Sequence, residues 1–275
     1  MPDYIGGMQP SLILNLSALL SLLPVSVLSL RQTAGRDGRY WSLLAVAVAG
    51  PIVVAINEVA QGWLTSLSAA LWLSIAASMI MFVGVSLSTR QGWRLTALLL
   101  PYLFLFGTGA VVAERVPAPA LPAATPATWL DVHVLVSVAT YGLLTIAAIA
   151  GLAVFIQERA LKERQPGWLT SVLPSVADAE RLQMQLLTAS GLVLGTGLLT
   201  GAATQYAMNG RLFEVNHKTV FAALAFAVIV LLLLVHRQTG IRGRRAARFV
   251  LLAYLLLTLA YPGVKFVTDV LMGRT

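Results

Sequence analysis

Long apolar runs separated by short polar stretches dominate the pattern of this chain. Each run reaches the ~20 residues with which a helix crosses the ~30 Å hydrocarbon core of a bilayer, where backbone groups must pair within the segment. The pattern predicts an all-α polytopic membrane protein, with residues 1–275 forming a single integral membrane domain. The eight predicted transmembrane helices cover residues 11–30, 41–61, 67–88, 95–113, 130–157, 182–208, 216–236 and 249–271.

Proline positions and polar connections refine this pattern. Pro51 predicts a kink in the second span, and Pro262-Gly263 breaks the last third of the eighth. Four prolines in residues 116–128 exclude a regular helix there and predict an extended external loop. The charged stretch from Glu158 to Arg181 is the longest predicted connection, although its last residues could begin the sixth helix. The N-terminus lacks the pattern of a cleaved signal, so we expect the first span to be retained.

Composition agrees with lipid as the solvent. Hydrophobic residues make up 58% of the chain and charged residues 11%, against about a quarter charged in soluble domains. The net charge of +8 does not indicate nucleic acid, because the basic residues lie in the short connections. Three follow the first span, two the third, four the fifth and five the seventh, of 19 in all. The positive-inside rule places these connections in the cytoplasm and both termini outside, in the periplasm.

Two of the three histidines stand at helix ends that this topology places on the outer side. His133 begins the fifth span and His217 the seventh. Two neutral imidazoles at one depth match the axial ligation of a haem iron. Because the chain has no cysteine, covalent haem attachment and thiolate sites are excluded. We therefore predict haem b, held non-covalently near the outer face. In the alternative interpretation, each imidazole bonds a lipid headgroup or a carbonyl.

The residues around these histidines extend the predicted site. Ser137 and Tyr141 follow His133 at helical spacing, so they could orient its imidazole or line the porphyrin pocket; an interhelical packing face is the alternative. Asn216 is a candidate for orienting His217. Lys218 and Lys265 could pair with the haem propionates, and the alternative is snorkelling towards headgroups.

His236 is separate from this site. It lies 19 residues beyond His217, roughly 28 Å along a helix, at the cytoplasmic end of the seventh span. It could be a second, cytoplasmic haem ligand, or an interfacial residue among the following arginines.

Two blocks of sequence carry a resemblance to a known family. The first is Leu130-Asp131-Val132-His133 with Ser137 and Tyr141, followed by Gln157-Glu158-Arg159. The second comprises Asn216-His217-Lys218-Thr219-Val220-Phe221, residues 240–246 and residues 261–266. Over residues 129–271 the chain resembles the cytochrome c assembly family of CcsA- and HemX-like proteins, and especially its eight-span YpjD-like branch.

The resemblance implies a multi-pass protein of the bacterial inner membrane that acts in cytochrome c maturation or haem handling. Histidines are its expected haem ligands, and another cytochrome c maturation or membrane protein is the expected partner. One departure is visible: Phe213-Glu214-Val215-Asn216 stands before His217, where the CcsA branch has a tryptophan-rich WWD segment.

Other functional classes have less support. The HExxH, GxSxG and P-loop motifs are absent, so we expect no catalytic activity of its own. A transporter would need intramembrane charges and paired broken helices, which this sequence does not present. The main alternative is a HemX-like scaffold or regulator that binds no haem. Its contact surface for a protein partner would be the charged connection from Glu158 to Arg181.

Overall fold

Helices account for the whole secondary structure of the described residues. The computed structural model describes residues 10–31, 35–60, 66–114, 127–210 and 216–267, and within these ranges it contains no strand, which confirms the all-α prediction. The elements in chain order are α1 (Pro10–Ser21), α2 (Leu23–Ser29), α3 (Gly38–Ala60), α4 (Leu67–Ser88), the 3-10 helix η1 (Gly92–Leu95), α5 (Thr96–Ala113), α6 (Ala127–Glu163), α7 (Trp168–Val172), α8 (Val176–Asn209), α9 (His217–Thr239), α10 (Gly243–Thr258), the π-helical turn η2 (Leu259–Gly263) and α11 (Val264–Phe266).

Local sequence signals set several helix ends. The side chains of Ser66, Ser175 and Asn216 accept hydrogen bonds from the backbone N–H three residues later, at 3.0, 3.2 and 2.9 Å. Gly210 and Gly240 end α8 and α9 in the left-handed conformation, with φ of 65° and 67°. These caps satisfy backbone groups that a helix terminus leaves without intrahelical partners.

Seven helical stretches among the described residues are long and apolar enough to cross a membrane, so the chain is a multi-span membrane protein. The predicted eighth span corresponds to α10, which begins at Gly243 and has 16 residues. Its α-helical pattern ends at η2, where Pro262 lacks an N–H to donate. The predicted loop at residues 116–128 lies outside the described residues, except that Ala127 and Thr128 belong to α6.

Pro51 lies inside α3, within the predicted second span. Two details differ from the sequence interpretation. The first span divides into α1 and α2 at Leu22, because Pro24 opens a new helical turn. The connection predicted from Glu158 to Arg181 is mostly helical: α6 continues to Glu163, and α7 and the start of α8 occupy most of the rest.

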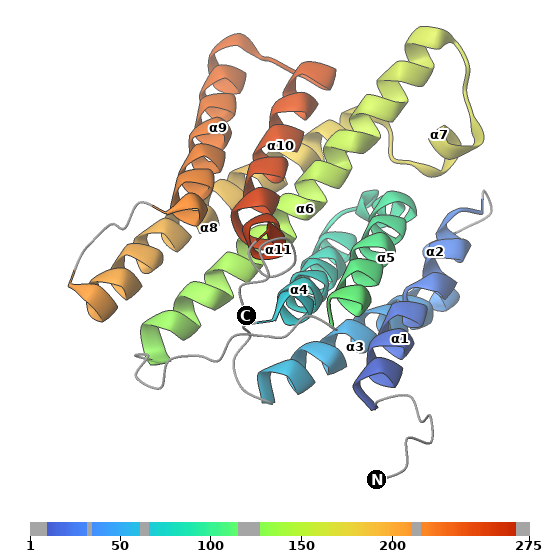
Figure 1. Cartoon of the computed structure of the whole chain (residues 1–275). Coiled ribbons are helices and arrows are strands. Elements are labelled where there is room, and N and C mark those ends of the chain that lie inside the picture. The colour runs from blue at the N-terminus through green and yellow to red at the C-terminus, as the bar shows by residue number, and fades with distance from the viewer. Residues whose placement is uncertain (1–9, 32–34, 61–65, 115–126, 211–215, 268–275) are drawn as a thin grey trace.

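The helices form two groups with α6 between them (Figure 1). The long helices α6 and α8 run antiparallel and make the most extensive contact in the molecule, with α9 and α10 packed beside them. On its other side α6 packs on α4, which belongs with α1, α2, α3 and α5. A Cβ added at Gly142 of α6 would lie 3.1 Å from the backbone of Ala77 in α4, so glycine allows this close crossing.

At one end of the molecule, polar side chains of α6 and α8 form hydrogen bonds with backbone groups of neighbouring segments. The Gln157 amide donates to the carbonyls of Thr170 and Pro174 at 2.9 and 3.0 Å, which holds α7 against the end of α6. At the start of α10, Glu158 accepts from the N–H of Arg244 at 3.0 Å and Glu180 accepts from the N–H of Gly243. These two carboxylates, here called the α10 cap, join α6, α8 and α10 at the end opposite the starts of α6 and α9.

Candidate functional site

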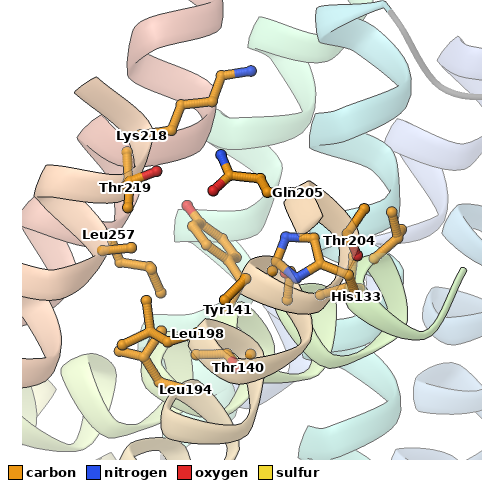
Figure 2. Close-up of a pocket in the computed structure, with 18 of the residues that line it drawn as sticks. His133, Thr140, Tyr141, Leu194, Leu198, Thr204, Gln205, Lys218, Thr219 and Leu257 are labelled. Carbon is orange, nitrogen blue, oxygen red and sulfur yellow. The ribbon is translucent and has the colours of Figure 1, made fainter. Parts of the chain in front are cut away.

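A cavity of about 420 Å³ lies between α6, α8, α9 and α10, with one residue of α4 on its wall. The close-up in Figure 2 shows side chains from several helices facing this space. Its apolar lining comprises Val134, Val138, Leu194, Leu198, Ala202, Ala222, Leu257 and Ala260, with Gly197 and Gly201. Its polar lining comprises Ser74, His133, Ser137, Thr140, Tyr141, Thr204, Gln205, Asn216, Lys218 and Thr219. A mainly apolar cavity with a few convergent polar groups is the usual form of a ligand site.

His133 is half-buried against α8, where two residues determine its position. A Cβ added at Gly201 would lie 3.0 Å from Cε1 of the imidazole, so the ring occupies space that a glycine leaves open. Nδ1 of His133 lies 3.3 Å from Oγ1 of Thr200, and that hydroxyl donates its own proton to the carbonyl of Gly197 at 3.1 Å.

The partner of the Thr200 hydroxyl and the tautomer of the imidazole are linked. In the arrangement in which that hydroxyl gives its one proton to Gly197, Nδ1 of His133 is the donor in the contact with Thr200. A neutral imidazole then has its lone pair on Nε2. Neutral imidazole nitrogens with the other ring N–H hydrogen-bonded are typical metal ligands. In that tautomer His133, which lines the cavity, has a ring nitrogen that could ligate an iron centre.

The predicted stripe on α6 forms one wall of the cavity. His133, Ser137 and Tyr141 all line it, and Tyr141 is nearly fully buried. Figure 2 shows the imidazole of His133 and the phenol of Tyr141 facing the same space, with the amide of Gln205 above them. The Tyr141 ring stacks on Phe106 of α5, at 6.1 Å between ring centroids. The wall thus contains an imidazole that could hold a metal and an aromatic ring fixed by packing.

The start of α9 supplies the mouth of the cavity. Asn216 accepts from both the N–H and the hydroxyl of Thr219, at 2.9 and 3.0 Å, and Asn216, Lys218 and Thr219 all line the cavity. The exposed Lys218 has an ammonium group that can meet an anionic part of a ligand.

Five of the seven residues predicted to bind the cofactor therefore lie around one cavity, and two are placed differently. His217 is the first residue of α9 and is exposed, between two lining residues, but it is not part of the lining. Lys265 belongs to α11, and its side chain is outside the described part of the structure.

The third histidine lies away from the cavity. Nδ1 of His236 bonds the carbonyl of Ile241 at 2.7 Å, which joins the end of α9 to the connection before α10. In the described residues no three His, Cys, Asp or Glu side chains come together to hold a bare metal ion. A metal that brings its own equatorial ligands, as haem does, needs only axial groups from the protein.

The sequence interpretation missed the contributions of α4 and α8. Ser74, Thr200, Thr204 and Gln205 lie in helices that carry no histidine, and nothing in their local pattern separates them from ordinary polar residues of a membrane helix. The glycines of α8 were the available signal. Gly197 and Gly201 are four residues apart, on one helical face, where small residues permit close approach of another helix.

Comparisons with known proteins agree with this architecture. The sequence profile of the family described as "Cytochrome C assembly protein" matches residues 39–272. The chain is 51% identical over 271 residues to the "Uncharacterized 28.8 kDa protein in nifR3-like 5'region" of Azospirillum brasilense, covering 97% of this chain and 100% of the relative. It is 28% identical over 200 residues to "Inner membrane protein YpjD" of Escherichia coli (strain K12), covering 72% of this chain and 73% of that relative. No solved structure matches the chain.

Proposed function

The chain belongs to the cytochrome c assembly family, and from that premise we propose that it is a haem-handling protein of the bacterial inner membrane. In this proposal it holds haem b non-covalently near the outer face and acts with a partner in cytochrome c maturation. The main support for the proposal is the cavity. Its lining brings together residues from two separate blocks of sequence: His133, Ser137, Tyr141, Asn216 and Lys218.

The lining of the cavity fits a haem in three respects. His133 would offer Nε2 to an iron centre in the tautomer whose Nδ1–H is directed at Thr200. The apolar side chains of α6, α8 and α10 suit the porphyrin ring, and the ammonium of Lys218 at the mouth suits a propionate. Haem supplies an iron centre with axial positions that a protein can fill.

Each residue of the site has a separate role in this proposal. His133 and His217 would supply imidazole ligands to the iron, His217 from the mouth, where Asn216 caps the first turn of α9. Tyr141 packs against the ligand and Ser137 contributes to the same wall. Lys218, with Lys265, neutralises the propionates. In this proposal His236 binds no haem: it lies at the other end of α9, with its Nδ1 on the carbonyl of Ile241.

The proposed topology has eight spans, with α10, η2 and α11 together forming the last. The connections at the same end of the molecule as the α10 cap would face the cytoplasm. They carry most of the Lys and Arg residues, which the positive-inside rule places on that side. The mouth of the cavity at the start of α9 would then open towards the periplasmic side. The inner-membrane relative supports this location.

Haemin titration of the purified, detergent-solubilised protein tests the proposal. We expect a saturable Soret shift in the wild type, weakened at least tenfold in His133→Ala because one imidazole ligand is lost. His236→Gln serves as the matched histidine control, and we expect it to titrate like the wild type. Equal haemin affinity of the wild type and of the His133→Ala, His217→Ala double variant would overturn the ligand assignment.

One observation favours a second candidate function, a haem-free scaffold or regulator. Trp168 of α7 and Leu161 near the end of α6 are 52% and 68% exposed, within the charged stretch from Glu158 to Arg181. Apolar side chains among charges can form a contact for a protein partner. If this function holds, replacing residues 164–172 with a Gly/Ser linker abolishes partner co-purification and leaves haemin binding unchanged. If the replacement has no effect on the partner, the scaffold function is excluded.

A further inference from the structure

The exposed face of α10 carries two arginines near its start and apolar side chains beyond them. From residue 245 onwards the exposed residues recur with the helical period, so they form one stripe along the helix. The buried residues lie on the opposite side, against the bundle: Ala246, Ala247, Val250, Ala253 and Leu257. The exposed set, here called the α10 stripe, extends into η2 and comprises Arg245, Arg248, Phe249, Leu252, Leu255 and Leu259.

The neighbouring helix α9 gives the depth of this stripe. The two helices are antiparallel and packed together, joined by the short connection at residues 240–242 (Figure 1). α9 is long and apolar enough to span a bilayer. Arg245 lies in the first turn of α10, level with the end of α9 that carries Arg237, and the apolar residues lie further along. In the proposed topology the stripe therefore runs from the cytoplasmic headgroup region into the apolar interior.

The sequence of this hairpin offers the two arginines no acidic partner. Residues 215–268 contain no Asp or Glu. The carboxylates of the α10 cap reach the start of the helix, but they accept from the backbone N–H groups of Gly243 and Arg244. In the described ranges of the chain the ion pair that forms joins Arg159 to Glu163 within α6, and no carboxylate pairs with Arg245 or Arg248. Both guanidinium groups are thus open to an external anion.

An anionic phospholipid matches both parts of the stripe. Its phosphate lies at the level of the headgroups, where a guanidinium group can bind it through paired N–H···O bonds. Its acyl chain is apolar and extends from the headgroup towards the middle of the bilayer, in the direction of Phe249, Leu252 and Leu255. Basic residues at the cytoplasmic end of a membrane helix also attract anionic lipids through their charge.

A second copy of the chain matches the stripe less well. Copies inserted in one membrane share their orientation, so a two-fold axis along the membrane normal brings like ends of α10 together. Arg245 and Arg248 of both copies would then meet, and like charges at close range repel. A lipid phosphate has the opposite charge, which favours the lipid as the occupant.

We propose that the α10 stripe binds an anionic phospholipid, with the phosphate on Arg245 and Arg248 and an acyl chain along the apolar residues. This site is distinct from the cavity, because no residue of the stripe belongs to the cavity lining. The inference rests on the proposed topology, in which α10 crosses the bilayer beside α9. It does not depend on haem.

Native mass spectrometry of the full chain, released from detergent micelles, tests the site. Phosphatidylglycerol and phosphatidylcholine with identical acyl chains are titrated separately, and the dissociation constants of the first bound lipid are compared. We expect phosphatidylglycerol to bind about three- to tenfold more tightly, the effect of about one arginine near an anionic headgroup. Equal constants for the two lipids would overturn the proposal.

Two double variants of equal charge separate this site from general attraction by a basic protein. Arg245→Gln with Arg248→Gln should lower the ratio of the two constants at least twofold. Arg159→Gln with Arg164→Gln removes two exposed arginines at the end of α6 and should keep the wild-type ratio. Equal falls in both double variants would assign the preference to net charge and overturn the proposal.

Further arms keep the test decisive. If the glutamine double variant does not fold, Arg245→Lys with Arg248→Lys keeps both charges and should retain the preference; loss of the preference in a folded lysine variant contradicts the site. Soluble glycerophosphoglycerol at the concentration of the lipid should not displace it, because it has no acyl chains, and an acidic peptide should not displace it either. Displacement by the first would exclude a role for the apolar residues, and displacement by the second would assign the surface to a protein partner.

Haemin titration of the wild type separates this inference from the proposed function. A wild type that binds no haemin but prefers phosphatidylglycerol through Arg245 and Arg248 would reject the haem proposal and keep the lipid site. Haemin binding without any lipid preference would do the reverse.

Discussion

Single residues of α8 determine how His133 faces the cavity. Gly201 leaves room for the imidazole, and Oγ1 of Thr200 lies 3.3 Å from its Nδ1. Neither residue could be assigned from the sequence, because the contact joins positions 67 residues apart in the chain. The stripe of His133, Ser137 and Tyr141 on one helix was predictable, since its spacing follows the helical period. Residues that share a helix face are visible in a sequence; their partners on another helix are not.

A methyl group at residue 201 is expected to displace the imidazole. In Gly201→Ala the new Cβ would lie 3.0 Å from Cε1 of His133, closer than ordinary packing allows, so the ring must shift. We predict haemin affinity at least fivefold lower, measured by Soret titration. Gly84→Ala is the control: Gly84 lies in α4 outside the cavity lining, nothing lies within 4 Å of a Cβ there, and its affinity should equal that of the wild type. Equal losses in both variants would contradict this account.

Removing the hydroxyl of Thr200 tests the tautomer assignment. Thr200→Val is close in shape but cannot accept from Nδ1 of His133, so the ring loses the bond that directs Nε2 to the cavity. Loss of such an orienting bond typically costs ten- to a hundredfold in metal affinity. We expect haemin binding to weaken within that range, and Thr200→Ser, which keeps the hydroxyl, to restore it. Weak binding in Thr200→Ser as well would count against the assignment.

At the scale of elements, the two carboxylates of the α10 cap join α6 and α8 to the first backbone N–H groups of α10. Gly243 has φ of 64°, and a Cβ there would overlap the carboxylate of Glu158. Sequence alone indicated a connection between the seventh and eighth spans, but not that carboxylates of α6 and α8 would pair with the first N–H groups of α10. The length of α6 was also underestimated, because charged residues at its end were assigned to a loop.

Comparing two glycines separates steric overlap from backbone strain. Gly240→Ala and Gly243→Ala both place alanine at positive φ, which costs about 1 kcal/mol. Only at Gly243 does the methyl also meet Glu158, whereas nothing lies within 4 Å of a Cβ at Gly240. We predict a larger fall in thermal unfolding temperature for Gly243→Ala, by several degrees, in detergent. Similar falls in unfolding temperature for both variants would show that the Glu158 carboxylate can move aside without loss of stability, which would contradict this prediction.

At the scale of the whole molecule, the apolar pattern predicted a multi-span helical protein, and the structure confirms that class. The pairing of helices was not predictable in the same way. Apolar helix faces look alike whether they meet lipid or another helix, since both are equally apolar. The placement of α6 between two groups, with the cavity on the side of α8, α9 and α10, therefore came from the structure.

The absence of cysteine makes the proposed sidedness directly measurable. Single variants Lys218→Cys and Thr239→Cys place thiols at exposed positions at opposite ends of α9. With an impermeant maleimide on spheroplasts, we expect labelling of Lys218→Cys, and labelling of Thr239→Cys only after permeabilisation. The reverse pattern would put the cavity mouth in the cytoplasm and contradict the topology.

The central claim is that the cavity holds haem through His133. Its most direct test is the absorption spectrum of the purified protein, oxidised and reduced, with a pyridine haemochrome assay for haem b. The account predicts a Soret band and sharp reduced α and β bands, which are lost in the His133→Ala, His217→Ala double variant and kept in His236→Gln. A colourless wild type that also fails to take up added haemin, or a double variant with the wild-type spectrum, would contradict it.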